Sequence, residues 1–391
     1  MHVPDGFIDA PVSAATAAVA AAAVAVSLRG ARRELDDKAA PLAGLVAAFV
    51  FAVQMLNFPV AAGTSGHLLG GALAAILVGP YTGVLCISVV LLMQGVLFAD
   101  GGLTALGVNI TDMGIVTTVV AYAVFRVLVR LLPRGRTGLS VASFAAALIS
   151  VPAAAAAFTL IYALGGTTDV PVGQVFTAMA GVHVLIGLGE AAITALTVSA
   201  VAAVRPDLVH GARDLLRPLE LRTTAVTLPG SPATSSRRDG DQPQRRGSAV
   251  PSDLATDGHH RSRPDGPGAV AAAEETRHRS AKRLWLAGVA AALLCAGGLS
   301  YYASTSPDGL EKVAHDKGID SKEAAHAAKD SPLADYQVKD VSDERLSGGL
   351  AGVIGVGATL AAGTGIFVTL RWKRARTAPA PAAAESETAA L

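Results

Sequence analysis

The chain has 391 residues, of which 51% are hydrophobic and only 16% are charged. About a quarter of the residues in an ordinary soluble domain are charged, so this composition excludes that class and indicates a membrane protein. The formal net charge of +1 indicates no nucleic-acid partner. Both cysteines, Cys86 and Cys295, lie in apolar runs and are interpreted as small buried hydrophobic residues.

Apolar runs of spanning length predict membrane helices along residues 1–205. Seven are expected, at residues 10–28, 41–60, 67–79, 81–98, 103–128, 139–165 and 172–204. Arginines cluster after the first, fifth and seventh of these runs. Since positive charges favour the cytoplasmic side, the N-terminus is expected outside the cell. Asp5 and Asp9 precede the first basic residue, Arg29, and argue against a cleavable signal peptide.

The composition changes in the second half of the chain. Residues 206–283 are rich in Pro, Ser, Gly, Asp and Arg, and are predicted to be a disordered cytoplasmic linker. Residues 284–376 are predicted to form a C-terminal module, in which two membrane helices flank an external soluble stretch, and residues 377–391 a disordered tail. The expected fold class is therefore all-α: a polytopic protein of the cell membrane with about seven transmembrane helices in residues 1–205, two in the module and a cytoplasmic C-terminus.

The first six residues, which we call the N-terminal hook, have the pattern of a metal chelator. The α-amine of Met1, the backbone nitrogen of His2 and the imidazole Nδ1 of His2 can bind one ion in fused five- and six-membered rings. Planar nitrogen sites favour Ni(II) or Cu(II), with Co(II) as a possible guest. Pro4 and Gly6 suit a turn around Asp5 that folds the hook back on itself. The alternative is a frayed, solvated terminus with a chance histidine.

His67 is a second candidate metal ligand. It lies at the mouth of a short, glycine-interrupted apolar segment, after the turn formed by residues 63–66. Interrupted helices mark substrate sites in membrane proteins, and an ionisable residue at membrane depth is a functional hypothesis by default. The alternative is an interfacial histidine bonded to a neighbour. Together with the hook, His67 is predicted to supply the fourth nitrogen of a planar site.

Other polar residues near the predicted spans are candidates to orient the metal ligands: Asn57, Thr64, Ser65, Gln94 and Asn109. Metal ligands in proteins are usually held by such outer partners. Hydrogen bonding between helices remains the alternative for Asn57, Gln94 and Asn109.

His183 and Glu190 are seven residues apart and therefore share one helix face. A proton or ion relay and a pair of structural polar groups both remain open for them. Several catalytic patterns are absent from the sequence. It contains no G-x-x-x-x-G-K-[ST] motif, so the chain does not hydrolyse ATP by a P-loop, and it contains no H-E-x-x-H motif and no cysteine pair at zinc spacing.

Three long runs of the first 205 residues resemble the CbiM/NikM family, which supplies the substrate-binding membrane component of cobalt and nickel energy-coupling factor (ECF) ABC transporters. They are Met1-His2-Val3-Pro4-Asp5-Gly6-Phe7, the run from Asn57 to Gly71 that contains Ser65-Gly66-His67-Leu68-Leu69-Gly70-Gly71, and the run from Gln94 to Asn109. Phe98-Ala99-Asp100 departs from the family's usual Phe-Gly-Asp. Pro307-Asp308-Gly309-Leu310-Glu311 resembles the PDGLE domain, a small accessory component similar to NikN or CbiN.

The resemblance implies that Met1, His2 and His67 bind the transported ion, Co²⁺ or Ni²⁺, for uses such as cobalamin biosynthesis or nickel enzymes. It also implies two partners besides the lipid bilayer: a transmembrane coupling subunit similar to CbiQ or NikQ, and a cytoplasmic ATPase similar to CbiO or NikO. The chain is expected to be the metal-capture subunit of an ATP-driven importer, and not itself an enzyme. The alternatives are a stand-alone secondary metal permease and a membrane metal sensor or scaffold.

Overall fold

The structure is a computed structural model, and it describes residues 1–35, 39–61, 63–212 and 267–377. Two compact units make up the chain: Met1–Arg217 together with Ser280–Leu391, and Pro218–Arg279. Everything below concerns the first unit. The predicted linker lies outside the described residues from 213 to 266, but the helix that follows already begins at Pro267, inside the predicted linker. The predicted tail lies outside the described residues beyond 377.

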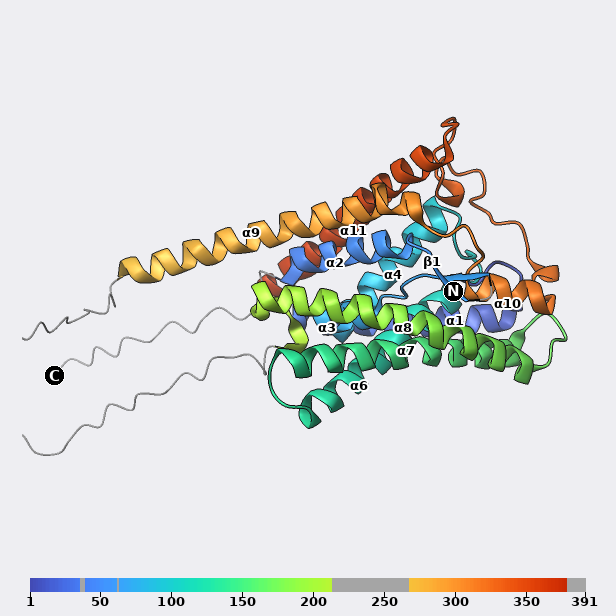
Figure 1. The fold of residues 1–391 in the computed structure, drawn as a ribbon, viewed down its shortest axis with the longest axis horizontal. Helices are drawn as coiled ribbons and strands as arrows, with labels where there is room; N and C mark the ends of the chain where they lie inside the picture. The colour runs from blue at the N-terminus through green and yellow to red at the C-terminus, as the bar shows by residue number, and fades with distance from the viewer. Residues whose placement is uncertain (36–38, 62, 213–266, 378–391) are drawn as a thin grey trace, which may run out of the picture. The chain divides into compact units, whose positions relative to one another are not determined.

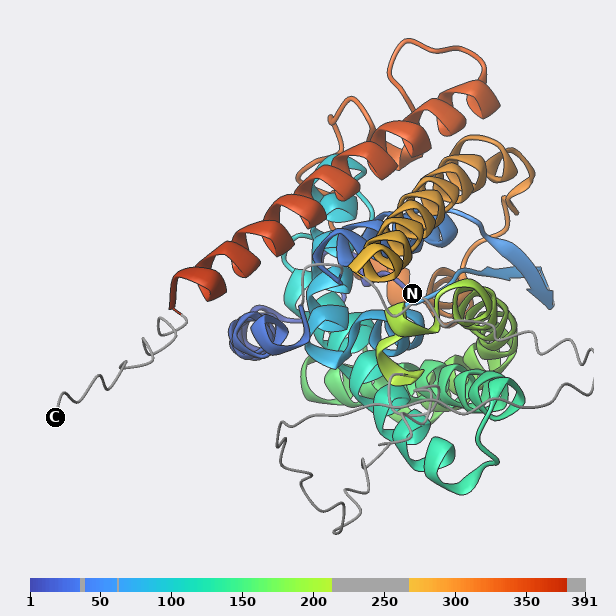
Figure 2. The same cartoon turned by 90° about the vertical axis from the view of Figure 1, so that its left-hand side faces the viewer.

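Helices dominate the described part of the chain (Figures 1 and 2). The first domain contains α1 (Ala10–Glu34), α2 (Ala39–Gln54), β1 (Phe58–Ala61), β2 (Thr64–Gly66), α3 (Gly71–Val78), α4 (Pro80–Leu97), α5 (Leu106–Asn109), the π-helix η1 (Ile110–Val116), α6 (Thr117–Leu131), α7 (Arg136–Gly165) and α8 (Val172–Val204). The C-terminal module contains α9 (Pro267–Gly297), α10 (Gly309–Lys317) and α11 (Glu344–Thr377). Short helical turns follow α8, namely η2 (Pro206–Leu208) and η3 (His210–Ala212), and others lie in the module: η4 (Leu299–Tyr302), η5 (Ile319–Lys322) and η6 (Ala334–Tyr336).

The predicted all-α polytopic fold class is confirmed, with seven described helices long and apolar enough to cross a membrane. Five of these belong to the first domain and two to the module. The predicted spans 41–60 and 67–79 are shorter than expected. The first ends at Gln54, and an antiparallel hairpin of β1 and β2 follows it. The second is the eight-residue helix α3, which rises only about 12 Å at 1.5 Å per residue and is shorter than a hydrocarbon core.

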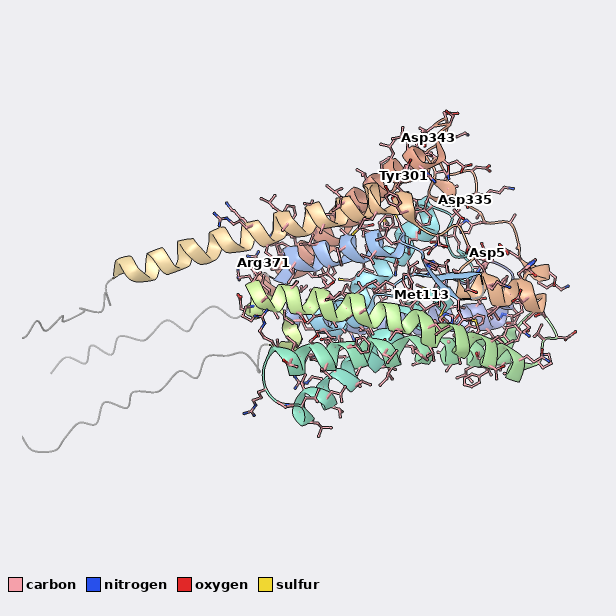
Figure 3. The ribbon with its side chains drawn as sticks, in the orientation of Figure 1. Asp5, Met113, Tyr301, Asp335, Asp343 and Arg371 are labelled. Carbon is pink, nitrogen blue, oxygen red and sulfur yellow. The ribbon has the colours of Figure 1, made fainter. Side chains whose placement is uncertain are left out.

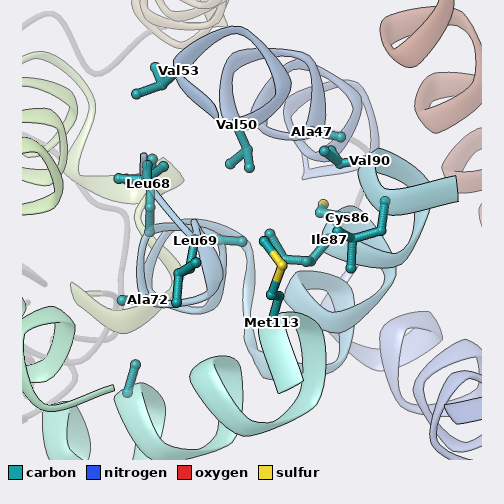
Figure 4. Packing of buried hydrophobic residues seen from close by; sticks show 14 of the residues in the cluster. Ala47, Val50, Val53, Leu68, Leu69, Ala72, Cys86, Ile87, Val90 and Met113 are labelled. Atoms are coloured by element: carbon teal, nitrogen blue, oxygen red, sulfur yellow. The ribbon is translucent and has the colours of Figure 1, made fainter. Parts of the chain in front are cut away.

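The core of the first domain forms where α2, α3 and α4 meet the π-helix. Every residue of α3 is buried, so this helix is enclosed on all sides by protein. Figure 4 shows Val50 of α2, Leu69, Ile87 of α4 and Met113 of η1 converging on one cluster. Apolar side chains on all faces suit a short helix that is surrounded by others, and the arrangement fixes the loop that precedes α3.

The N-terminal hook is folded into the protein and is not a frayed end. Met1 and Val3 are buried, and Asp9 caps α1 through a hydrogen bond from Val12 N to its Oδ1 at 2.9 Å. In Figure 1 the N-terminus lies beside β1 and α10. The interpretation of residues 1–6 as a solvated terminus is therefore wrong, because packing against later segments holds the hook in place.

The C-terminal module packs on the first domain. Gly44 of α2 approaches Thr364 of α11, and Gly355 of α11 approaches Phe51 of α2, so closely that a Cβ on either glycine would overlap the partner side chain. The polar segment that joins α9 to α11 covers the end of the domain where the N-terminus lies. Figure 3 shows Asp5, Asp335 and Asp343 near this end, and Arg371 at the opposite end of the helices.

Candidate metal centre

The amine of Met1 lies against the imidazole of His67. Met1 N is 2.6 Å from His67 Nε2, and both residues are buried. The Nδ1 atom of His67 is 3.1 Å from the carbonyl oxygen of Leu68, which can only accept a hydrogen bond. A neutral His67 therefore donates from Nδ1 and presents the lone pair of Nε2 to the Met1 amine.

His2 brings a second imidazole to the same place. Its ring centroid is 5.2 Å from that of His67. Nδ1 of His2 is buried without a hydrogen-bond partner, although Asp100 Oδ1 lies 3.3 Å away. Burial lowers the pKa of His2 to about 4, and the nearby Asp100 carboxylate opposes this only in part. At neutral pH the ring is uncharged, and the tautomer with its hydrogen on Nε2 places the Nδ1 lone pair beside a carboxylate, a setting that favours a cation.

These positions suit a nitrogen-ligated ion. Adjacent donors around a planar ion with bonds of about 2.0 Å lie about 2.8 Å apart, close to the 2.6 Å between Met1 N and His67 Nε2. Among the described residues, no group of three or more His, Cys, Asp or Glu side chains is arranged to hold a metal. A site here therefore needs the backbone nitrogens of the hook as well as the side chains of His2 and His67.

The hook is held by the segment that runs from the end of α4 to η1. Asn109 Oδ1 accepts a hydrogen bond from Val3 N at 2.7 Å, and Asn109 Nδ2 donates to Val3 O at 3.2 Å. Asp5 Oδ1 accepts from both the backbone N and the hydroxyl of Thr104, at 2.8 and 2.5 Å. Asn109 thus holds the backbone of the hook, and its role in orienting a metal ligand stays a prediction.

A buried carboxylate fixes the loop that carries His67. Glu190 of α8 accepts hydrogen bonds from Leu69 N at 2.7 Å and Gly70 N at 3.1 Å. His183, by contrast, bonds through Nδ1 to the carbonyl of Met179 at 2.8 Å. The two side chains therefore contact different backbone groups, which favours the structural interpretation of both over a relay. The sequence pattern placed them on one helix face but did not identify the loop that Glu190 holds.

Two other predicted residues join the first domain to the module. Ser65 donates from its hydroxyl to Ser306 O at 2.7 Å and from its backbone N to Pro307 O at 2.8 Å. The backbone carbonyl of Asn57 accepts from Ser304 N at 2.7 Å. These contacts lie in the stretch just before α10, so Ser65 and Asn57 position the module next to the site.

The last two predicted residues are Thr64 and Gln94. Thr64 is buried in β2, and Gln94 is buried in α4, where its backbone carbonyl accepts from Asp100 N at 3.1 Å. Across the described ranges, no hydrogen bond joins the side chain of either residue to the hook or to His67. A role of these two residues in orienting the ligands therefore stays a prediction.

Asp308 of the module belongs to the run that resembles the PDGLE domain, but the sequence patterns did not single it out as a residue of the metal site. It caps α10: its Oδ1 accepts from Leu310 N at 2.7 Å and Glu311 N at 2.9 Å. Its Oδ2 lies 2.6 Å from Met1 N and 3.4 Å from His67 Nε2. Burial alone would raise the pKa of this carboxyl, but the charged amine and His67 hold it well below its usual value. The capping pattern Asp308-x-x-Glu311 predicts a helix start, whereas nothing local predicts what lies opposite it.

A cavity of about 940 Å³ adjoins the site. Residues of both the first domain and the module line it, among them His2, His67, Asp100, Asp308, His326 and Tyr336. Tyr336 donates from its hydroxyl to Asp100 Oδ2 at 2.5 Å, and so ties the module to the loop beside His2. The site therefore lies at the boundary between the two parts of the chain.

Comparison with known proteins identifies both parts. A family model described as the cobalt uptake substrate-specific transmembrane region, CbiM, matches residues 2–208, and a PDGLE domain model matches residues 282–372. A putative metal transport protein of Haloquadratum walsbyi is 40% identical over 213 residues, 54% of this chain and 93% of that protein. A putative fused nickel transport protein NikMN of Archaeoglobus fulgidus is 41% identical over 215 residues, 54% of this chain and 68% of that protein.

Solved structures also resemble this chain. The crystal structure of a truncated transition metal transporter covers 52% of this chain and 99% of its own, with 26% identity and a TM-score of 0.46. The CbiM model spans more than half of the residues. The chain therefore belongs to the CbiM family of cobalt uptake substrate-specific transmembrane regions, and it carries a PDGLE domain after that region.

Proposed function

We propose that this chain is the substrate-binding component of an ATP-driven ECF importer of Co²⁺ or Ni²⁺ in the cell membrane, with its N-terminus outside and its C-terminus inside. The observation that carries the proposal is the 2.6 Å approach of Met1 N to His67 Nε2, beside the unpartnered Nδ1 of His2. Met1, His2 and His67 are the proposed ligands. The family's name and the name of the nickel transport relative support the choice of ions.

Loading the site requires the release of protons. An ion between Met1 and His67 replaces the proton that the amine shares with Nε2, and the backbone nitrogen of His2 must also lose its proton to bind. Apparent affinity therefore falls as pH falls, because protons compete for the same nitrogens. The hook then acts as a lid over the bound ion, since its own backbone supplies the ligands.

Energy for transport comes from partners in this proposal. The sequence contains no P-loop, so ATP hydrolysis belongs to a separate ATPase similar to CbiO or NikO. A coupling subunit similar to CbiQ or NikQ connects that ATPase to residues 1–205. The module, residues 284–376, assists loading through the cavity that it shares with the site.

Uptake of radioactive Co²⁺ or Ni²⁺ by whole cells tests the function. Cells should accumulate the ion only when the chain is expressed together with the coupling subunit and the ATPase, and a substitution of the ATPase P-loop lysine should abolish uptake. The variants His2→Ala and His67→Ala should lose uptake although they reach the membrane, whereas His278→Ala, in the predicted linker, controls for loss of an imidazole. Full uptake by the chain alone would show a stand-alone permease. Bound metal without uptake in any combination would show a sensor or scaffold.

A further inference from the structure

Two of the three N–H groups of the Met1 ammonium have acceptors at 2.6 Å: one faces His67 Nε2 and the other faces Asp308 Oδ2. When the amine binds a metal, it keeps two N–H groups. The ion takes the place of the proton that faces His67, because both nitrogen lone pairs then point at it. The N–H that faces Asp308 is not consumed, so this hydrogen bond persists in the loaded site.

Asp308 is itself rigidly held. Oδ1 is fixed by the N–H groups of Leu310 and Glu311, and Glu311 Oε2 accepts from Asp308 N at 2.8 Å. Because one carboxylate oxygen is anchored at the start of α10, the position of the other is set by the helix. The amine, by contrast, belongs to the first residue of a chain and would otherwise rotate freely about its bond to Cα.

We propose that Asp308 is a positioning residue for the metal site: the C-terminal module holds the Met1 amine in the orientation in which it binds the ion together with His67. The proposal rests on the proposed function and adds a partner for its first ligand. Outer carboxylates that fix a metal ligand contribute about 10–100-fold to metal affinity. By thermodynamic linkage, the bound metal strengthens docking of the module by the same factor.

Docking of the module does not depend on Asp308 alone. Ser65 bonds to Pro307, Ala324 N donates to Asp5 O at 2.8 Å, and Asp335 N donates to Phe98 O at 2.9 Å. A variant that changes only the oxygen facing the amine therefore keeps the module in place. Asp308→Asn is such a variant, because asparagine caps helices as well as aspartate does. Its amide nitrogen, however, turns a donor toward the donor of Met1.

The test compares the full-length variants Asp308→Asn and Glu311→Gln with the unsubstituted chain, using Ni²⁺ and Co²⁺ as probes in competition titrations. Each variant removes one negative charge from the same helix turn, but Glu311 does not contact the amine, and glutamine can still accept from Asp308 N. We expect Asp308→Asn to bind about 10–100-fold more weakly. Glu311→Gln should bind as the unsubstituted chain does. Asp308→Ser, whose hydroxyl caps the helix but does not reach the amine, should repeat the loss.

Two readouts separate positioning from structure. Without metal, Asp308→Asn should keep the helical circular dichroism of the unsubstituted chain, and the upward shift of its thermal unfolding midpoint on metal addition should be smaller than that of Glu311→Gln. At saturation its visible absorption spectrum should be unchanged, because the nitrogen ligands are the same. Unchanged affinity in both Asp308 variants, equal loss in Glu311→Gln, or an altered spectrum showing Asp308 to be a ligand would each overturn the proposal. An unsubstituted chain that binds neither ion would instead overturn the proposed function.

Discussion

Asn109 holds the backbone of Val3 through both ends of its side-chain amide, accepting from Val3 N at 2.7 Å and donating to Val3 O at 3.2 Å. This pair mimics the hydrogen bonding of a neighbouring strand at the residue directly after His2. Asn109 is the last residue of α5, and the π-helix begins directly after it. Its hydrogen bonds to Val3 therefore fix the hook against a packed helix.

Asn109→Leu should therefore loosen the hook. The substitution leaves the buried N–H of Val3 without a partner, at a cost of about 1–3 kcal/mol where water does not replace it, whereas Val3 O still accepts from Gly102 N at 2.9 Å. We expect Ni²⁺ affinity to fall by about 10–100-fold in a competition titration. Thr111→Val is the matched control, because the buried hydroxyl of Thr111 makes no hydrogen bond. Equal affinities of the two variants would contradict the assigned role of Asn109.

Glu190→Gln should weaken the loop that carries His67. Glutamine can accept from only one of the two N–H groups, those of Leu69 and Gly70, and directs its own donor at the other. We expect the free energy of unfolding to fall by about 1–3 kcal/mol and metal binding to weaken with it. Thermal unfolding in detergent, with and without metal, measures both. Thr194→Val, one helical turn away and also buried without a partner, should change neither; a loss as large as that of Glu190→Gln would argue against a specific role for the carboxylate.

Gly6 should tolerate no side chain. Its φ is +90°, and a Cβ there would overlap the carbonyl oxygen of Lys322 in the module. Gly63 has a φ of +73° and open space around its Cα, so Gly63→Ala carries only the backbone strain of about 1–2 kcal/mol. We expect Gly6→Ala to displace the module from the hook and to reduce metal loading. Crosslinking between cysteines placed in the hook and the module measures the displacement. Equal crosslinking and loading in both variants would refute the predicted contact.

The proposed orientation in the membrane predicts a labelling pattern. In a chain whose native cysteines are replaced by alanine, Thr168→Cys should react with an impermeant maleimide from outside intact cells. Ser236→Cys, in the predicted linker, should react only after lysis. Figure 3 shows Arg371 at the end of the helices opposite Asp335 and Asp343, and the proposed orientation places this basic end in the cytoplasm. Labelling of Ser236→Cys in intact cells would reverse the orientation.

The sequence alone proposes the part of the candidate site that consists of short motifs. The hook could be proposed because the chelate rings that it would form involve only Met1 and His2, which are adjacent in the chain. His67 stood out because an ionisable residue in an apolar, glycine-rich stretch needs an explanation. No local sequence pattern distinguishes a solvated N-terminus from a buried one. The packing of the folded chain shows that the N-terminus is buried.

What could not be predicted depends on contacts between distant segments. Asp308 meets Met1 across 307 positions, and Glu190 meets Leu69 across 121. Neither contact produces a hydrophobic periodicity or a motif spacing from which the sequence would predict it. The boundaries near residues 55–66 were missed for another reason. An apolar run that turns from helix into a β-hairpin keeps its hydrophobicity, so the run from 41 to 60 suggested one continuous span.

The central claim is that the Met1 amine binds the metal, which requires that Met1 is the first residue of the mature protein. Mass spectrometry of the N-terminal peptide establishes that residue, and one glycine added before Met1 then moves the amine out of the chelate. The extended chain keeps His2, His67 and every helix, and the same glycine added after Leu391 is the control. We expect the N-terminal extension to lower Ni²⁺ and Co²⁺ affinity by more than about 100-fold, beyond the loss of an outer contact, and the C-terminal extension to leave it unchanged. Full metal binding by the N-terminally extended protein would contradict the account.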